Sequence, residues 1–307
     1  MARGASRKIV LCYSRTMALL LITSFIWAFS FGLVKNCLGG VDAAFVAFLR
    51  LALALLLFLP LWRPRRFPGP LSRRLLGIGM VEFGLMYVFY IQSFRFLAAH
   101  QVALFTVFTP LYVALFADVL ERRFRPLHLW TALLAVAGSG VIVYSGWGSG
   151  GLLAGFSLVQ ASNACFAAGQ VWYRRLSAAG RAWRDRDVFA WLYLGGAAAA
   201  ALAMAVNPGG IDLRLDAAQI LVLLYLGLLA SGMGFFLWNI GASRVSTGTL
   251  AVMNNLKVPL AVAVSLAFFH EHADLPRLAV GGTVIAFALY LNTRSESIHR
   301  DRVSKAE

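Results

Sequence analysis

Residues 89–110, FYIQSFRFLAAHQVALFTVFTP, align without a gap with residues 238–259, WNIGASRVSTGTLAVMNNLKVP, at an offset of 149 residues. The alignment matches Arg95 with Arg244 and Pro110 with Pro259. A glutamate follows each proline at the same distance to within one residue, at positions 121 and 271. A match that keeps a proline inside an apolar segment indicates an internal duplication. We therefore expect a chain built from two related halves.

The composition is that of a membrane protein. Of the 307 residues, 60% are hydrophobic and only 13% are charged, whereas a soluble domain needs about 25% charged residues. Four runs lack Asp, Glu, Lys and Arg altogether: Thr16–Val34, Pro126–Tyr173, Val188–Ile211 and Ala217–Ser243. Each run can hold one or two spans of about 20 residues. The chain is therefore predicted to be an all-α, polytopic membrane protein.

Turn residues and charges divide the apolar sequence into ten expected transmembrane helices. These are 16–34, 43–62, 75–94, 99–120, 127–145, 152–173, 188–206, 217–239, 247–269 and 277–293. They form two five-helix repeats, 16–146 and 151–293, between tails at 1–15 and 294–307. Because five is odd, the second repeat is expected to enter the membrane inverted relative to the first.

The basic residues predict the orientation. The N-terminal tail and every second connection after it hold 22 of the 28 lysines and arginines, and the intervening connections hold 4. By the positive-inside rule, both termini are expected to be cytoplasmic. The net charge of +15 thus reports orientation and not nucleic-acid binding. The first apolar run lacks a cleavage site and is predicted to be an uncleaved anchor.

Lys257 is the only charged residue between Val245 and His270. It lies about nine residues into its span, or ~14 Å, close to the centre of a ~30 Å hydrocarbon core. Facing lipid there would cost about 3 kcal/mol. Two interpretations stay open: a contact for an anionic substrate group, or a structural ion pair. Glu82 lies at a similar depth, as a static partner of Lys257 or as a residue that couples transport to protons.

Pro110 and Pro259 are expected to kink their helices, because proline removes a backbone donor and frees a carbonyl. Asn254 and Asn255 flank the second kink, so they join Lys257 in a polar patch that could contact substrate. Kinks that serve packing alone are the alternative. Two further cavity candidates at membrane depth are Asn163 and Trp27.

Several other features predict structure and not chemistry. Arg50 enters its span by ~10 Å and is expected to snorkel outward as an anchor. His270 and His272 flank Glu271, but residues two apart on a helix do not share a face, so no metal site is predicted. The three cysteines suggest neither a disulfide framework nor a metal site.

The sequence shows no nucleophile–base pairing, no phosphate-binding glycine loop and no acidic metal cluster. We therefore expect neither an enzyme nor a cofactor. Transport by this chain would have to draw energy from a gradient, because no nucleotide site is present in the sequence.

Four segments resemble a known family: FTPLYVALFADVLE (108–121), LKVPLAVAVSLAFFHE (256–271), FLRLALALLLFLP (48–60) and IWAFSFGLVK (26–35). They are similar to paired EamA domains of the drug/metabolite transporter superfamily, over about residues 15–295. The resemblance implies a ten-helix inner-membrane carrier, often an exporter, with a central cavity built from both halves. The chain departs from its own repeat at two positions: no arginine of the second half matches Arg50, and Lys257 aligns with Phe108.

Together these features predict a secondary transporter that exports amino acids, amines or carboxylates by alternating access, with protons as the candidate coupling ion. Its cavity would hold Lys257, Asn254, Asn255 and Glu82. A membrane-embedded enzyme or lipid-handling protein is one alternative. A non-transporting sensor on the same fold is another, and it would be favoured by a closed, bulky interior. The oligomeric state is left open.

Overall fold

The structure is a computed structural model. It describes residues 2–63, 69–121, 150–178, 183–206, 214–245 and 247–271, with isolated positions at 130, 134 and between 274 and 291. Every regular element in these ranges is helical. The α-helices are α1 (Ala2–Cys37), α2 (Ala43–Phe58), α3 (Gly69–Gly79), α4 (Met86–Ser93), α5 (Ala99–Phe105), α6 (Thr109–Glu121), α8 (Gly150–Ala178), α9 (Asp185–Ala205), α10 (Ala217–Leu224), α11 (Gly234–Ala242) and α12 (Thr247–Phe268).

Short segments of other helix types join or extend several of these helices. The 3₁₀ turns are η1 (Leu59–Leu61) and η4 (Thr106–Phe108), and the π-helical segments are η3 (Met80–Leu85) and η5 (Tyr225–Met233). Segment η3 joins α3 to α4, η4 joins α5 to α6, and η5 joins α10 to α11. Three expected spans are therefore continuous but change helix type near their middle.

Seven helical stretches in the described residues are long and apolar enough to cross a membrane. They are Thr16–Cys37, Ala43–Leu61, Gly69–Ser93, Ala99–Leu120, Gly151–Ala178, Asp185–Ala205 and Ala217–Ala242, and they match seven of the expected spans. Helix α12 covers an eighth, with its apolar part at Leu256–Phe268. The spans expected at 127–145 and 277–293 fall largely outside the described residues. The all-α, multi-pass membrane fold is confirmed, and the count of ten in two inverted repeats stays a prediction.

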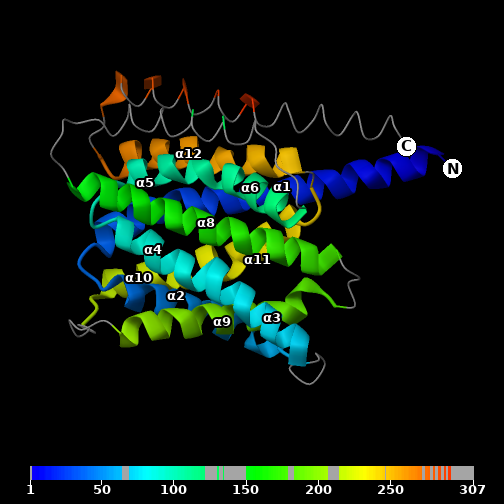
Figure 1. Cartoon of the computed structure of the whole chain (residues 1–307), viewed down its shortest axis with the longest axis horizontal. Helices are drawn as coiled ribbons and strands as arrows, with labels where there is room; N and C mark the ends of the chain where they lie inside the picture. The colour runs from blue at the N-terminus through cyan, green and yellow to red at the C-terminus, as the bar shows by residue number, and fades with distance from the viewer. Residues whose placement is uncertain are drawn as a thin grey trace.

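The spanning helices lie side by side along the long axis of the molecule (Figure 1). Helix α2 packs against α9 and η5, α1 against α12 and α11, and α8 against α4 and α6. Helices from the first and second halves of the chain thus alternate in space, and each half completes the packing of the other.

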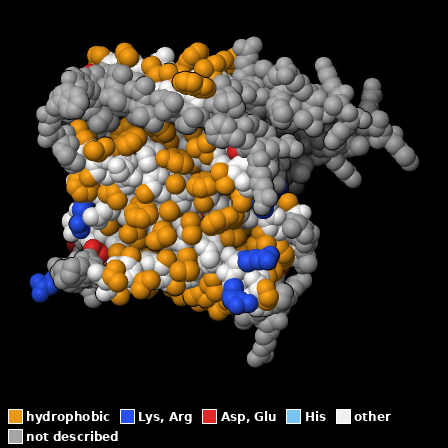
Figure 2. Space-filling view, in the orientation of Figure 1, with side chains coloured by type: hydrophobic (Ala, Val, Ile, Leu, Met, Phe, Trp, Pro, Cys, Tyr) orange, Lys and Arg blue, Asp and Glu red, His pale blue; other side chains and the backbone are white. Residues whose placement is uncertain are grey.

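The outer surface is suited to lipid. Large apolar side chains such as Phe25, Leu56, Leu153 and Leu221 are more than half exposed. Figure 2 shows hydrophobic side chains across the visible face, with lysine and arginine side chains near its margins. An apolar surface this extensive would be unstable in water, and it is what a lipid environment requires.

The π-helical segments occupy matching places in the two halves, since the repeat offset places η3 over the end of η5. The wider π turn leaves carbonyls for other donors. In η5, Ala230 O accepts a hydrogen bond from Trp27 Nε1 at 2.8 Å, and Gly232 O accepts one from the Tyr193 hydroxyl at 2.6 Å. Because lipid offers no substitute donor, these side chains stabilise the irregular turn.

Two glycines allow the span that begins with α3 to touch α9. A Cβ atom on Gly79 would overlap the carbonyl oxygen of Leu192, and a Cβ atom on Gly195 would overlap that of Leu76. Small residues at such crossings let backbones approach closely, which gives membrane helices much of their packing energy. This contact fixes the span that carries Glu82 against the second half of the chain.

Replacing Gly79 with alanine tests this contact. We expect a loss of about 1–3 kcal/mol of stability, because the new methyl group forces the two backbones apart. The measurement is the melting temperature of the purified protein in detergent. The control is Gly77→Ala on the same helix, where a Cβ atom meets nothing within 4 Å. This control should be neutral or stabilising by up to about 1 kcal/mol. Equal melting temperatures for the two variants would contradict the close contact.

Candidate substrate cavity

The helices line a cavity of about 60 Å³. Its wall includes residues from α1, α2, α4, α6, α8, α11 and α12 and from η4. The wall includes six aromatic side chains: Trp27, Phe31, Tyr87, Tyr90, Phe166 and Phe235. The two charged residues among the described lining residues, Arg50 and Lys257, are both cations.

Lys257 lies in this wall, and its side chain is buried to 5% exposure. Its Nζ atom lies 5.2 Å from the ring centroid of Trp27, 5.4 Å from Phe166 and 6.0 Å from Trp238. Aromatic faces attract a cation, by roughly 2 kcal/mol or more where water is excluded. Among the described residues, no hydrogen-bond acceptor or carboxylate pairs with Nζ. The aromatic rings therefore stabilise the ammonium group, but no described residue supplies a negative charge to it.

Arg50 does not snorkel outward, so that expectation was wrong. Its side chain is 1% exposed and lines the cavity. Nη2 donates to the Tyr87 hydroxyl at 2.7 Å, Nε donates to Ser231 Oγ at 3.2 Å, and Cζ lies 4.0 Å from the centroid of the Tyr87 ring. Tyr87 and Ser231 also share a hydrogen bond of 2.9 Å. The hydroxyls of Tyr87 on α4 and Ser231 in η5 accept hydrogen bonds from the guanidinium inside the protein. The side chain therefore stays buried and does not extend to the membrane interface.

Glu82 lies away from the cavity wall, in η3, and is fully buried. Its Oε1 accepts a hydrogen bond from Asn239 Nδ2 at 3.2 Å, and its Oε2 has no partner among the described residues. The structure records no ion pair between Glu82 and Lys257 in the part of the chain it describes. Neutral groups therefore surround both Glu82 and Lys257, and the two side chains do not pair with each other.

Pro110 follows a real interruption of its helix, because α5 ends at Phe105 and α6 starts after the 3₁₀ turn. Asn163 Nδ2 donates to Phe105 O at 2.8 Å, and Thr109 Oγ1 donates to Thr106 O at 2.7 Å. The freed carbonyls are thus satisfied by side chains. Asn163 lines the cavity and also stabilises this break, a role that its position in the sequence did not indicate.

Pro259 differs from Pro110, because it lies inside the continuous helix α12. Asn254 is buried one turn before Lys257, and both atoms of its amide lack a partner among the described residues. It does not belong to the cavity wall. The side chain of Asn255 lies outside what the structure describes. The cavity thus brings together Lys257, Trp27 and Asn163 of the candidate residues, and it leaves out Glu82 and Asn254.

Sequence reasoning missed the residues that hold Arg50 and Trp27 in place. Neither Tyr87 nor Ser231 was singled out from the sequence. The available signal was the repeat, because Ser231 lies in the part of the second half that matches the π-helical segment around Glu82.

A family comparison agrees with this architecture. The model of the EamA-like transporter family matches residues 14–144 and 153–294. The chain belongs to this family. EamA proteins are transporters, so the protein is a membrane transporter and not an enzyme.

Three curated relatives match nearly the whole EamA chain. The protein named "Probable biotin transporter" in Pseudomonas aeruginosa is 44% identical over 90% of this chain and 97% of its own length. The "Biotin transporter" proteins of Salmonella typhimurium and Escherichia coli are 39% and 38% identical, each over 91% of this chain and 93% of their own length. A solved crystal structure superposes with a TM-score of 0.64 at 20% identity, over 91% of this chain and 96% of that chain, which supports the fold.

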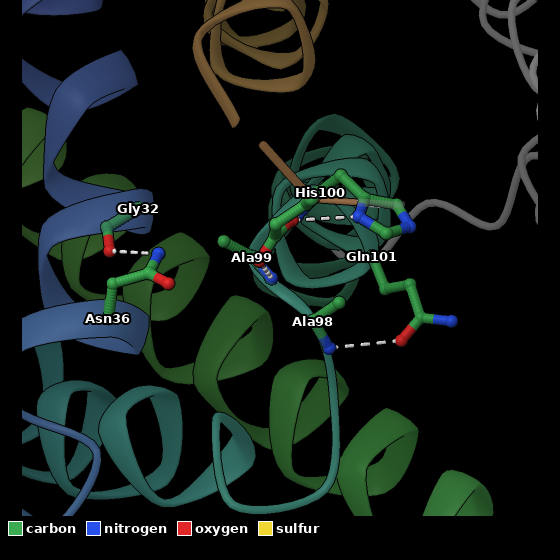
Figure 3. Close-up of polar contacts among 7 residues, drawn as sticks. Gly32, Asn36, Ala98, Ala99, His100 and Gln101 are labelled. Carbon is green, nitrogen blue, oxygen red and sulfur yellow. Dashed lines mark hydrogen bonds and ion pairs between the residues drawn. The ribbon is translucent and has the colours of Figure 1, made fainter. Parts of the chain in front are cut away.

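Glu271 connects the end of α12 to the start of α5 in this EamA protein. Its Oε1 accepts from the Ala99 N–H at 2.8 Å, and its Oε2 accepts from the His100 N–H at 3.0 Å and lies 2.8 Å from His100 Nδ1. Figure 3 shows His100 beside Ala99 at this helix start, where the Gln101 side chain accepts from Ala98 N at 3.0 Å. A carboxylate here satisfies free N–H groups and complements the helix dipole. We call these contacts the Glu271 cap.

The surroundings of Glu271 change its acidity. Burial acts to raise the pKa of the carboxyl, but the hydrogen bonds from His100 and from the Ala99 backbone outweigh it and hold the pKa below its ordinary value of 4.5. Glu271, which lies between His270 and His272, thus acts as a helix cap. His272 lies outside the described residues. The described residues contain no cluster of metal-ligating side chains.

Replacing Glu271 with glutamine should destabilise the protein by about 1–3 kcal/mol, because the amide turns a donor toward backbone donors. Since the folded pKa lies below the unfolded one, the carboxylate stabilises fully above pH 4.5, and this stabilisation is lost as the pH falls through the folded pKa. Melting temperatures in detergent should therefore differ most at neutral pH and converge in acid. Gln101→Ala removes a neutral cap and should give a pH-independent loss. A pH-independent loss for Glu271→Gln would refute the assignment.

Proposed function

We propose that the protein is a secondary transporter that moves a small organic carboxylate through this cavity by alternating access, with biotin as the first candidate substrate. The observation that carries the proposal is the pair of buried cations, Arg50 and Lys257, in one aromatic wall without an acidic residue among its described members. Proteins 38–44% identical over nearly their whole length are named biotin transporters.

The electrostatics select among the three predicted substrate classes. A buried cation without a counter-charge loses its hydration, and neutral partners offset only part of that loss. A carboxylate in the cavity would supply that counter-charge, whereas an amine would add a third positive charge. An amino acid would bring one group of each sign. We therefore retain carboxylates and withdraw amines.

The apolar part of the wall supports the same class of substrate. Trp27 meets Phe166 and Phe235 edge to face, with ring centroids 6.1 and 5.2 Å apart. Such rings suit an aliphatic chain or a flat ring between polar ends. The space they leave open favours transport over the sensor alternative, which requires a filled interior.

The membrane setting of the proposal follows the charge distribution. The positions of the basic residues support cytoplasmic termini, and the family resemblance supports an inner-membrane location. The family resemblance predicts export. Vesicles of both orientations, loaded or unloaded with labelled biotin, would measure the direction and the sidedness together.

Lys257→Gln in proteoliposomes tests the substrate site. We expect the wild type to exchange labelled biotin and the variant to do so at least about tenfold more slowly, because a charge-assisted hydrogen bond is lost. The matched control is Arg73→Gln, which removes an exposed cation and should keep the wild-type rate. If the wild type moves no biotin and no other small carboxylate, the proposed function is wrong. If both variants match the wild type, the assigned site is wrong.

Glu82 is the proposed proton carrier. It lies in a π-helical segment, with one carboxyl oxygen bound to Asn239 and the other without a partner among the described residues. A single free oxygen on a buried carboxyl is suited to a proton that comes and goes between conformations. One proton moved with each carboxylate would also make the cycle electroneutral, so that the membrane potential neither drives nor opposes it.

Glu82→Gln separates coupling from binding. The amide has the same shape and can still accept from Asn239, so biotin exchange at equal pH on both sides should stay within about twofold of the wild type. Accumulation driven by a pH gradient should disappear, as measured by labelled biotin uptake with and without an ionophore. Full pH-driven accumulation in the variant would remove Glu82 from the coupling mechanism.

A further inference from the structure

The two cations of the cavity are held in different ways. Arg50 is bound by two hydroxyls and stacked on the Tyr87 ring, so two of its three nitrogens already donate hydrogen bonds. Lys257 meets only aromatic faces. These differences indicate that the two ends of a bound molecule meet different chemistry.

Lys257 requires a full counter-charge. An ammonium group is a compact charge that is strongly hydrated in water, and its Nζ atom has no acceptor among the described residues. The Lys257 side chain lines the cavity. A carboxylate that reaches the cavity can therefore form a direct ion pair with Lys257.

Arg50 requires less counter-charge than Lys257. Its charge is delocalised and more weakly hydrated, and the hydroxyls of Tyr87 and Ser231 already accept from Nη2 and Nε. Only Nη1 is left, buried and without an acceptor in the part of the chain that is described. One neutral carbonyl oxygen would satisfy it. A carboxylate placed here would instead leave Lys257 without its counter-charge.

We infer that the cavity is a two-part site: Lys257 binds the carboxylate of the substrate, and the cluster of Arg50, Tyr87 and Ser231 binds a neutral carbonyl oxygen of the same molecule. The inference rests on the proposed function and names the substrate class more closely. The substrate is a monocarboxylate whose far end carries a urea-type or amide carbonyl, with an apolar body between them that packs on Trp27 and Phe166. Biotin has this arrangement.

The test measures the affinity of the full-length protein for three ligands. Biotin carries both groups, biotinamide replaces the carboxylate by a neutral amide, and 2-iminobiotin replaces the urea oxygen by an imino group. The wild type should prefer biotin to each analogue by about tenfold or more. Biotinamide loses one charge-assisted hydrogen bond, and the cyclic guanidine of 2-iminobiotin is protonated near neutral pH and brings N–H donors and a positive charge toward Arg50. Displacement of labelled biotin from detergent-purified protein gives the two ratios.

The two cation variants should lose different ratios. Lys257→Gln should bind biotin and biotinamide equally and keep the preference over 2-iminobiotin. Arg50→Gln should bind biotin and 2-iminobiotin equally and keep the preference for biotin over biotinamide. The control is again Arg73→Gln, which should keep both ratios. If the assignments are exchanged, or if both ratios fall together in both variants, the inference is overturned.

A second pair of variants covers the case in which Arg50→Gln does not fold. Tyr87→Phe and Ser231→Ala remove the hydroxyls that orient the guanidinium and keep its charge. They should lower only the preference for biotin over 2-iminobiotin, by about threefold or more. An unchanged ratio would overturn the role of the cluster. If biotin is transported but the ratios do not separate, only this inference fails. If biotin neither binds nor moves, the proposed function fails with it.

Discussion

A backbone group that loses its helical partner inside a membrane has to find another partner within the protein, and this constraint explains where the polar side chains lie. The helix interruption before Pro110 requires donors, and Asn163 and Thr109 supply them. The π-helical segment η5 requires donors as well, and Trp27 and Tyr193 supply them. Trp27, Asn163 and Thr109 also line the cavity. The irregular backbone and the cavity therefore share the same supporting side chains, so a substitution that alters one alters the other.

The cavity is also defined by how the two cations are protected. Arg50 is enclosed by hydroxyls and an aromatic face, and Lys257 is enclosed by aromatic rings alone. Neither arrangement replaces a counter-charge. A site of this kind is stable enough to fold, because cation–π contacts and hydroxyls offset part of the lost hydration. The two positive charges still have no counter-charge among the described residues, and an anionic substrate would supply one when it binds.

The sequence predicted the fold well, because long apolar runs and the distribution of charge depend on composition and spacing alone. The structure brings three of the predicted cavity residues, Lys257, Trp27 and Asn163, to one cavity wall, and their contact with substrate stays a prediction. The sequence was wrong about Arg50, since depth along a helix does not say which face meets a polar neighbour, and Ser231 lies 181 residues away. The sequence also predicted the same effect on the helix for Pro110 and for Pro259, but their local structures differ. The first follows a 3₁₀ turn and the second lies in an unbroken helix, a difference set by which side chains lie opposite.

The cations come one from each half of the chain, Arg50 from α2 and Lys257 from α12, and neither has a counterpart in the other repeat. A symmetric dimer of either half would present two identical charges facing each other across its axis, and it would treat both ends of a bound molecule alike. Discrimination between head and tail of a ligand thus needs two unlike halves. Joining the duplicated units in one polypeptide is what allowed each to change without changing the other.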